Sequence, residues 1–396
     1  MSRVLVLNAG SATLKFGLYE QDACRLRGLV DRIGDAPALR LHSGEVDTAG
    51  FAPAEVGHAG VAEALLDWLD DCIGLDDLAG VGHRVVHGGT ELAEPVRLDA
   101  DRLTYLTGLE PLAPLHQPHA LAIVRDLLAR HPELPQVACF DTAFHRTQPR
   151  LRQLFALPRR LADEGVLRYG FHGLSYAHVA RRLAEVVGPA SAQGRVVVAH
   201  LGQGCSLCAL EAGRSVATSM GFTALDGMMM GSRCGRLDPG VVLYLLRERG
   251  MSVDEVERLL YHDSGLLGVS GLSADMRDLL GSHDAHAAEA VALFIDRLIG
   301  EIGTLVALLG GLDALVFTGG IGEHAAEIRQ RTLHRLGWLG ITLDAPANAR
   351  HDLRIDRGHS SVPRGPAVAV IPTDEEGEMA LGTRACLARE GASFPR

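Results

Sequence analysis

The chain opens on the stretch RVLVLNAGSATLKFGLY, residues 3–19. The apolar run RVLVL is followed by small and hydroxyl residues and then by the alternating segment LKFGLY, which predicts a strand, a tight turn and a second strand. Small residues in such a turn let backbone N–H groups approach an anion closely, and Ser11, Thr13 and Lys15 add two hydroxyls and a positive charge. We therefore expect a phosphate-binding hairpin, which differs from the P-loop because no helix follows it.

Lys15 is the one lysine among 38 lysine and arginine residues, so every other basic side chain of the two types is arginine. An ammonium group is a compact point charge, whereas a guanidinium group is a wider and rigid fork. A tight phosphate site favours the ammonium group. The alternative is that Lys15 is a remnant of a strong bias toward arginine.

Composition limits the possible functions. A length of 396 residues predicts at least two domains, and 47% hydrophobic with 22% charged residues indicates a globular protein. The net charge of −11 disfavours nucleic acids and anionic membranes as partners. Seven cysteines without framework spacing, no signal segment and no membrane-spanning run predict a cytoplasmic protein. Cys205 and Cys208 form an isolated C-x-x-C, which we interpret as two small buried residues of a strand.

A segment similar to the opening hairpin occurs at residues 195–210, RVVVAHLGQGCSLCAL. This segment superposes on the start of the chain with Gly202 at the place of Gly10 and Leu210 at the place of Leu18. Two similar hairpins half a chain apart predict a duplicated domain, with each half offering a phosphate-binding turn to a shared cleft.

A third glycine-rich segment, TGGIGEH at 318–324, follows a predicted strand at 314–317 and opens a predicted helix that continues through Arg335. A strand, a glycine turn and a helix are typical of a nucleotide site, and a plain packing turn is the alternative. We expect a domain boundary within 146–160 and a C-terminal helix at 375–389 that returns to the first domain. Residues 34–60, which are rich in glycine and alanine and lack strong periodicity, are expected to form an irregular segment at the surface.

Four short clusters combine arginine, histidine or aspartate with glycine. They are GHRVVHGG at 82–89, FDTAFH at 140–145, YGFHG at 169–173 and GSRCG at 231–235. Taken singly, such a histidine is more often a core residue and such an arginine a structural cap. Together with three glycine turns they supply what phosphoryl transfer needs, namely a backbone cradle, a carboxylate for Mg²⁺ and cationic donors. A nucleotide-dependent phosphotransferase is favoured, whereas the H-E-x-x-H and G-x-S-x-G patterns are absent from the sequence.

The same motifs resemble the acetate and propionate kinase family, within the superfamily of sugar kinases, actin and heat-shock chaperone ATPases. Matching segments occur in one order along nearly the whole chain, at 8–16, 82–89, 113–116, 140–145, 169–173, 219–223, 231–235, 268–273 and 317–323. The resemblance implies an α/β fold of two duplicated actin-like (ribonuclease H-like) domains with an active-site cleft between them. It implies an acyl-side domain, 1–148 joined by helix 378–396, and a nucleotide-binding domain, 149–377. A homodimer is also implied.

The resemblance also assigns residue roles. The catalytic residues would be Asp141, His172, Arg233, Arg84 and His116. The acyl substrate would contact Arg84, Val86, Leu115, Phe171 and Ala224. Asn8 and Glu375, with Asp141, would hold Mg²⁺ or Mn²⁺ directly or through water. The nucleotide, ATP or ADP, would contact Lys15, Ser11, Thr13, His200, Leu201, Gly202, Gln203, Gly204, Asp275, Met276, Arg277, Gly320, Ile321, Gly322, Glu323 and His324.

The implied reaction is reversible transfer of the γ-phosphoryl group of ATP to acetate, which gives acetyl phosphate and ADP by direct in-line attack. A carboxylic acid with a pKa of about 4 is ionised at neutral pH, so attack requires no general base. The repulsion between two anions must instead be offset by Arg84, Arg233, Lys15 and the metal ion.

Several positions depart from the family pattern and leave the specificity open. Gln203 and His324 each stand where asparagine is usual, and Ala12 and Thr13 interrupt a serine run, so the nucleotide preference is open. Ala224 replaces a common proline and favours a larger acid such as propionate, whereas the bulk of Val86 favours acetate. The alternatives are a propionate or other short-chain acyl kinase, more distantly a sugar kinase, and an actin-like nucleotide switch. A switch would not need an arginine such as Arg84 for a carboxylate.

Overall fold

The computed structural model describes residues 3–44, 46–114, 116–357 and 365–391. The chain divides into two compact units, unit 1 (Met1–Phe144 with Asp374–Arg396) and unit 2 (His145–Thr373). The boundaries expected from the sequence each lie four residues further along the chain, at 148 against 144 and at 377 against 373. Asp374 belongs with unit 1 because its carboxylate accepts hydrogen bonds from the Arg27 side chain and from the Gly377 backbone N–H.

Unit 1 is built on a mixed sheet whose described strands run in the order β4-β3-β2-β1-β5-β7-β6. Its strands are β1 (Arg3–Ala9), β2 (Leu14–Glu20), β3 (Ala23–Asp31), β4 (Ala38–Ser43), β5 (Leu78–Val85), β6 (Val96–Arg97) and β7 (Gln136–Phe140). Its helices are α1 (His58–Ile73), α2 (Ala100–Thr107), the 3-10 helix η1 (Glu110–Leu112), α3 (Gln117–Arg130) and α16 (Glu375–Gly391). Strands β1 to β4 form an antiparallel meander, and β5 and β7 continue the sheet parallel to β1.

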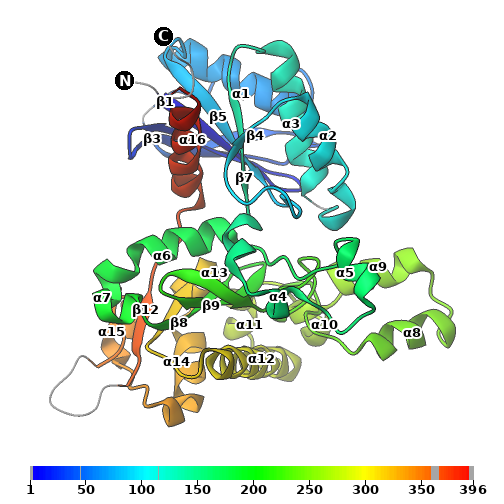
Figure 1. Ribbon diagram of the computed structural model, residues 1–396, viewed down its shortest axis with the longest axis vertical. Helices are drawn as coiled ribbons and strands as arrows, with labels where there is room; N and C mark the ends of the chain where they lie inside the picture. The colour runs from blue at the N-terminus through cyan, green and yellow to red at the C-terminus, as the bar shows by residue number, and fades with distance from the viewer. Residues whose placement is uncertain (1–2, 45, 115, 358–364, 392–396) are drawn as a thin grey trace. The chain divides into compact units, whose positions relative to one another are not determined.

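Helices cover both faces of this sheet because successive residues of a strand face opposite sides. Val81 of β5 belongs to an apolar cluster with residues of α1 and α3 such as Leu65 and Leu127. Its neighbour Gly80 faces the other side, where an added Cβ would lie 3.0 Å from Leu387 of α16. The C-terminal helix therefore returns to the first sheet, as Figure 1 shows in red beside β1 and β5.

Unit 2 carries a smaller sheet with the described strand order β10-β9-β8-β11-β12. Its strands are β8 (Arg195–Leu201), β9 (Cys205–Glu211), β10 (Arg214–Thr218), β11 (Ala314–Thr318) and β12 (Ala367–Val370). Its helices are α4 (Arg150–Gln153), α5 (Arg159–Asp163), α6 (Gly173–Val187), α7 (Pro189–Ala192), α8 (Pro239–Arg247), α9 (Val253–His262), α10 (Gly265–Ser270), α11 (Met276–Gly281), α12 (Ala285–Leu309), α13 (Gly319–His324), α14 (Ala326–Arg335), η3 (Gly337–Leu339) and α15 (Ala345–Ala349). The 3-10 helix η2 (Ala143–Thr147) spans the chain boundary between the units.

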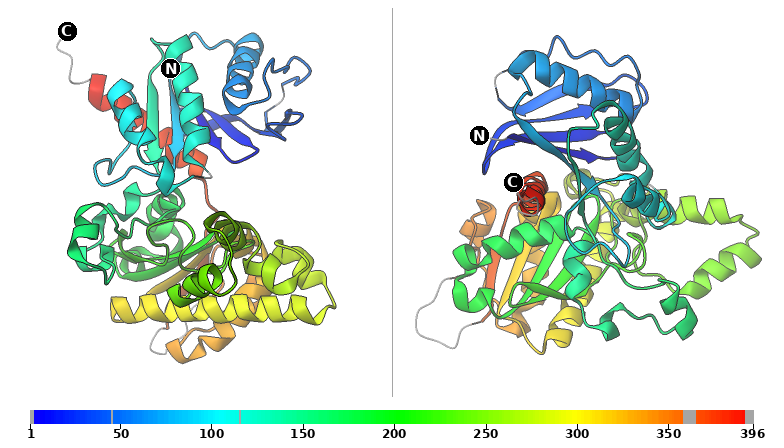
Figure 2. Two further views of the ribbon diagram at one scale, coloured as in Figure 1. Left: turned by 90° about the vertical axis from the view of Figure 1, so that its right-hand side faces the viewer. Right: turned by 45° about the horizontal axis from the view of Figure 1, so that its top comes forward.

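The long helix α12 packs against this sheet through a buried stripe. Ala290, Phe294, Leu298 and Ile302 recur at four-residue spacing and are buried. Figure 1 shows α6 on the other side of the sheet, and Figure 2 shows α12, in yellow, along one side of unit 2. None of the helices in the described part of the chain has both the length and the apolar composition that crossing a membrane requires.

The two sheets confirm the expected duplication. Each contains three antiparallel strands followed by two parallel ones, β3-β2-β1-β5-β7 in unit 1 and β10-β9-β8-β11-β12 in unit 2. The proposed superposition is wrong by one residue in the second strand. Arg3 pairs with Glu20, whereas Arg195 pairs with Glu211, so Ala209 and not Leu210 corresponds to Leu18. The reason is that the turn of the second hairpin is one residue shorter.

Other expectations are corrected locally. The segment at 34–60 contains β4, an edge strand that pairs with β3; its apolar–polar alternation covers only residues 39–42 and is too short to stand out. The helix expected from the TGG segment to Arg335 is broken at Ala325, which separates α13 from α14. Cys205 and Cys208 are free and buried on β9, as expected.

Candidate active site

Three predicted site residues of unit 1 lie at one edge of its sheet. Asn8 is the penultimate residue of β1, Arg84 is the penultimate residue of β5, and Asp141 directly follows β7. Because these strands are parallel, their carboxyl ends meet at the same edge, which is where α/β proteins usually bind ligands. The strand order therefore brings together residues that are far apart in the sequence.

Arg84 links this group through its guanidinium. Its Nη2 donates to Oδ2 of Asp141 at 2.5 Å and its Nε to Oδ1 at 3.2 Å, while Nη1 donates to Oδ1 of Asn8 at 3.2 Å. The Arg84 side chain is 16% exposed and that of Asp141 is 1% exposed. Burial opposes the charge of Arg84, but the Asp141 and Glu375 carboxylates more than offset it and raise the pKa of Arg84. The guanidinium thus stays charged and is held in one orientation.

Glu375, the first residue of α16, adds a second carboxyl group. Burial raises the pKa of Glu375 to about 7, the positive charges of Arg84 and Lys15 act against this rise, and the Asp141 and Glu376 carboxylates add to it. Lys15 therefore lies within electrostatic reach of this group, and its own side chain is exposed on β2 at the position opposite Asn8.

The remaining predicted residues of unit 1 are less closely tied to this edge. Val86 is buried just after β5. Ser11 is exposed and Thr13 half-buried in the turn between β1 and β2, and His116 is half-buried where α3 begins. Leu115 lies outside the described residues. Their roles stay predictions.

In unit 2 the turn after β8 lies between two predicted catalytic side chains. A Cβ added to Gly204 would lie 3.0 Å from Nε2 of His172 and 3.9 Å from Nη1 of Arg233. The same Arg233 nitrogen donates to the Ala224 carbonyl at 3.1 Å. His172 precedes α6 in a left-handed conformation, with φ at 57°, which is uncommon for residues other than glycine. Gly204 therefore packs closely against the imidazole of His172, with the Arg233 guanidinium beside it, and a larger residue at this position would displace one of them.

The imidazoles of His172 and His200 stack with centroids 4.2 Å apart and planes 18° apart. Nδ1 of His172 is 2.8 Å from Oγ of Ser206, and Nδ1 of His200 is 2.8 Å from Oγ of Ser175. A Cβ on Gly202 would be 3.8 Å from Nε2 of His200. Both rings therefore turn their Nε2 atoms toward the turn at 202–204.

A pocket of about 650 Å³ lies beside the same turn in unit 2. Predicted nucleotide residues that line it are Gly202, Gln203, Asp275, Met276, Arg277, Gly320, Ile321 and His324. Sequence reasoning missed Ser273, Ala274, Leu280 and Ala325, although each lies within a few residues of a predicted one. A pocket of this size fits a small-molecule cofactor or substrate.

Neighbouring predicted residues support this pocket and do not line it. The Oε1 atom of Glu323 accepts the backbone N–H groups of Gly319 at 2.8 Å and Thr373 at 3.0 Å. Gly319 has φ at 76°, and an added Cβ would lie 2.8 Å from the carbonyl oxygen of Leu201, so the turn requires glycine. Gly322 is buried in α13.

Phe171 is another predicted acyl-site residue of unit 2. Its side chain is buried, and its carbonyl oxygen is 2.9 Å from Nε2 of His145. Ala224 contributes its carbonyl to Arg233, a contact that does not depend on the side chain at this position.

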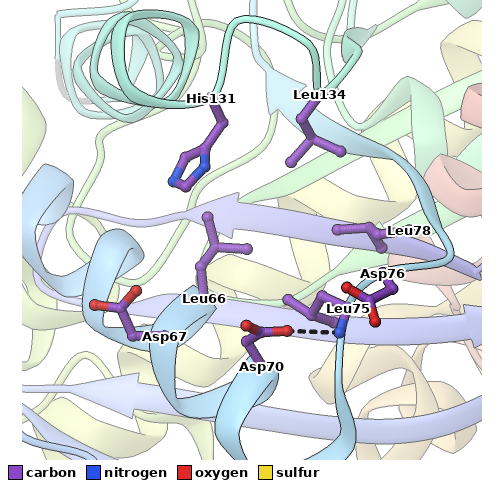
Figure 3. A pocket seen from close by; sticks show the side chains of 8 residues that line it. All are labelled: Leu66, Asp67, Asp70, Leu75, Asp76, Leu78, His131 and Leu134. Carbon is purple, nitrogen blue, oxygen red and sulfur yellow. Dashed lines mark hydrogen bonds between the residues drawn. The ribbon is translucent and has the colours of Figure 1, made fainter.

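Unit 1 also has a pocket of about 300 Å³ that none of the motifs predicts (Figure 3). It is lined by Leu66, Asp67, Asp70, Leu75, Asp76, Leu78, His131 and Leu134. Leu78 begins β5 and Leu134 precedes β7, so this pocket lies at the sheet edge opposite Arg84 and Asp141. It is separate from the candidate active site.

The residues present fit a hard divalent cation of the Mg²⁺ type. Asp141, Glu375 and Asn8 offer two carboxylates and one amide oxygen, and Mg²⁺ in phosphoryl-transfer sites is usually held by one or two carboxylates, substrate phosphates and water. Among the described residues no group of three or more His, Cys, Asp and Glu side chains is arranged to hold a metal ion by itself.

Comparisons with known proteins agree with these features. A model of the Acetokinase family matches residues 3–381. Acetate kinase of Rhodopseudomonas palustris is 51% identical over 382 residues, which cover 94% of this chain and 95% of that protein. The crystal structure of Porphyromonas gingivalis acetate kinase has a TM-score of 0.85 at 32% identity and covers 98% of this chain and 100% of its own. A propionate kinase structure from Francisella tularensis has the same TM-score, 0.85, at 35% identity, with 96% and 99% covered.

Proposed function

The chain belongs to the Acetokinase family, and on this premise we propose that it reversibly transfers the γ-phosphoryl group of ATP to acetate, giving acetyl phosphate and ADP. The observation that carries the proposal is the half-buried Arg84 guanidinium, which Asp141 and Asn8 hold at the carboxyl edge of the parallel strands. A nucleotide switch would need no fixed cation for a small carboxylate.

Acetate would bind to Arg84 in unit 1, with Val86, Leu115, Phe171 and Ala224 as the proposed apolar surroundings. Acetate is already ionised at neutral pH and attacks the phosphorus directly. Arg84 neutralises part of the substrate's charge, and Asp141 fixes the plane of the guanidinium through two hydrogen bonds. The Asp141 carboxylate therefore acts by orienting Arg84 as well as by its own charge.

The nucleotide would bind in the pocket of unit 2 beside Gly202 and Gln203. His172 and Arg233, which flank Gly204, would donate to the equatorial oxygens of the phosphoryl group as negative charge develops on them. Lys15, Ser11, Thr13 and His116 are proposed to assist from unit 1.

We propose Mg²⁺, with Mn²⁺ as a substitute, as the required cation, held by Asn8, Asp141 and Glu375 directly or through water. When bound, such an ion neutralises charge on the phosphate oxygens. Addition of a chelator should abolish activity, and excess Mg²⁺ should restore it.

Acetate is the first choice of acid, and propionate is the second candidate. The similarity to a propionate kinase structure at 35% identity and the alanine at 224 favour propionate, whereas the buried Val86 narrows the site and favours acetate. Comparing kcat/KM for acetate, propionate and butyrate decides between them, and a clear preference for propionate would overturn the first choice.

The activity itself is tested by trapping the acyl phosphate with hydroxylamine in the presence of ATP, Mg²⁺ and each acid. We expect the hydroxamate with acetate. Retained ATP binding without product from any short acid would favour the nucleotide switch instead.

We also propose a cytoplasmic homodimer. All seven cysteines are free, which fits a reducing compartment. Helix α8 buries none of its residues, and its apolar side chains Val241, Leu243 and Tyr244 are 38%, 48% and 51% exposed. A second copy of the chain would cover this apolar face. Light scattering should give a dimer for the native protein and a monomer for the Leu243→Glu/Tyr244→Glu variant.

A further inference from the structure

Arg329, on α14, has the largest side chain among the completely buried residues that the structure describes. A buried guanidinium is costly unless its N–H groups are hydrogen-bonded and its charge is balanced. Burial lowers the pKa of Arg329 to about 10, and no charged group of the described residues counteracts this decrease. The guanidinium is thus charged at neutral pH, and its hydrogen bonds have to account for its presence.

The guanidinium of Arg329 uses all five of its N–H groups, and none of the acceptors is a carboxylate. Nε donates to Oδ1 of Asn348 at 2.8 Å. Nη2 donates to the backbone carbonyl of Asn348 at 2.8 Å and to Nδ1 of His351 at 3.0 Å. Nη1 donates to the carbonyl oxygens of Gly322 and Glu323, both at 2.8 Å. The guanidinium therefore connects α15 and His351 with the end of α13.

Helix α13 needs support from outside because it has only six residues. Isolated helices of this length are not stable in water, since few of their backbone groups bond within the helix. The last four carbonyls of a helix have no partner within it, and Arg329 binds two of them, those of Gly322 and Glu323. At the other end, Oε1 of Glu323 accepts the backbone N–H of Gly319 at 2.8 Å. Side chains thus hold α13 at both ends.

Helix α13 also forms one wall of the pocket of about 650 Å³ in unit 2. Gly320, Ile321 and His324 of this helix line the pocket. The two carbonyls that Arg329 binds belong to the residues between Ile321 and His324, so this wall cannot shift without breaking those hydrogen bonds. The ring of His324 also meets the ring of His351 edge to face, with centroids 6.0 Å apart.

We propose that Arg329 is a positioning residue for the nucleotide, which fixes the end of α13 so that Gly320, Ile321 and His324 keep the shape of the pocket wall. The inference rests on the proposed function, because it takes this pocket as the site of ATP and ADP. Loss of Arg329 should weaken nucleotide binding and leave the binding of acetate at Arg84 unchanged. A purely structural role would lower the stability and leave the Kd of the folded protein for the nucleotide unchanged.

Isothermal titration calorimetry of ADP with the full-length protein, without any acid, tests the proposal. Arg329→Lys keeps the charge, but the donors of an ammonium group radiate from one nitrogen and cannot replace a planar fork. We expect the Kd for ADP to rise roughly tenfold or more, because a displaced wall loses several contacts at once. KM for ATP should rise in parallel, and KM for acetate should change little. An unchanged Kd in folded Arg329→Lys overturns the proposal.

Arg331→Lys is the matched control on the same helix. The Arg331 side chain is exposed and pairs with Glu327 at 3.3 Å, so this variant should bind ADP like the native protein. Thermal melting, followed by circular dichroism, shows whether each variant is folded at the assay temperature. A Kd that rises as much in Arg331→Lys as in Arg329→Lys would overturn the specific role of Arg329.

His351 provides a milder pair of variants in case Arg329→Lys does not fold. Its φ is 59°, a left-handed conformation that glycine and asparagine tolerate. His351→Asn keeps an acceptor oxygen close to the position of Nδ1, whereas His351→Gly removes it. We expect the Kd for ADP to be roughly two- to tenfold higher in His351→Gly than in His351→Asn, as for one hydrogen bond. If Arg329→Lys does not fold, native Kd values in both His351 variants overturn the proposal.

The native protein separates this inference from the proposed reaction. If it binds ADP and forms no acyl phosphate from any short acid, the proposed reaction is wrong, and the comparison of Kd values still decides the role of Arg329. If it binds neither ADP nor ATP, both proposals are overturned.

Discussion

The hairpins β1–β2 and β8–β9 occupy the same place in two sheets of the same topology, yet different chemistry surrounds them. Around the first lie fixed charges, with Arg84, Asp141 and Glu375 coupled to one another. Around the second lie glycines and two stacked histidines whose Nδ1 atoms meet serine hydroxyls. The duplicated topology supplies the position, and under the proposed function the side chains would adapt one edge to a small carboxylate and the other to phosphate.

The largest loss of activity is expected at the sheet edge of unit 1 that carries Arg84 and Asp141. Arg84→Ala removes the cation between Asp141 and Asn8, and kcat/KM for acetate should fall by at least about 10²- to 10³-fold. Initial rates of acetyl phosphate formation measure this loss. Arg195→Ala, which breaks a two-point pair with Asp313 at the start of β8, is the matched control and should retain near-native turnover. Near-native turnover in Arg84→Ala would contradict the assignment.

A similar loss is expected beside the second hairpin. Arg233→Ala removes a donor next to Gly204, and kcat should fall by about 10²- to 10³-fold while KM for acetate changes little. Arg258→Ala, whose side chain is 77% exposed on α9, serves as the control. If KM for acetate rose and kcat stayed constant, Arg233 would belong to substrate binding.

Glycine substitutions compare the two turns directly. A Cβ on Gly204 would occupy the space in front of His172 Nε2, so Gly204→Ala should lower kcat by roughly tenfold or more. A Cβ on Gly10 would lie 2.5 Å from Oγ1 of Thr13, a side-chain atom that can rotate away, so Gly10→Ala should lower kcat less. If the two variants were equally stable to heat and lost kcat to the same extent, the two turns would not differ in function.

Lys15→Arg tests the ammonium group of the first hairpin. We expect a fall of a few-fold in kcat/KM for ATP, smaller than for either arginine, because Lys15 is exposed and the charge is retained. Lys15→Met should lose more. Full activity of Lys15→Arg would mean that the lone lysine is a compositional remnant.

The smallest functional effect is expected at His83, a unit 1 histidine paired with an amide instead of a hydroxyl. Burial lowers the pKa of His83 to about 4, although its Nε2 lies 2.6 Å from Oε1 of Gln136. Because the folded pKa is below the unfolded value of about 6.5, the unfolded state binds the proton first. The free energy of unfolding should therefore fall as the pH falls from about 6.5 to about 4.

Urea titrations at several pH values measure this dependence, with His83→Gln as the comparison. The variant should show a shallower decline across that pH window at unchanged turnover. An equally steep decline would assign the pH dependence to other groups.

The sequence predicted the parts of the fold that depend on local pattern. The buried strands β1 and β8 have strong apolar runs, and the glycine turns have strong breakers. The edge strand β4 has no such signal, because it buries only Leu39 and Leu41 in part against the core and its alternation covers four residues. The one-residue shift at Leu210 was missed because a turn length is invisible to an ungapped superposition.

The site was predicted to a similar extent. Arg84 and Asp141 stand in recognisable glycine or strand-end clusters, and the structure brings them together at one sheet edge. Ser206 and Tyr176 have no such signal. A serine inside a strand and a tyrosine inside a helix look like ordinary core residues until α6 and β9 place both hydroxyls against each other at His172.

The exposed lone lysine of β2 has a practical consequence for labelling. Apart from the α-amino group, an amine-directed reagent finds a single target in the whole chain, Lys15. A fluorophore or crosslinker attached there would report on the first hairpin alone, without any engineered cysteine. The arginine-rich composition thus makes one strand of this molecule individually addressable by ordinary acylation chemistry.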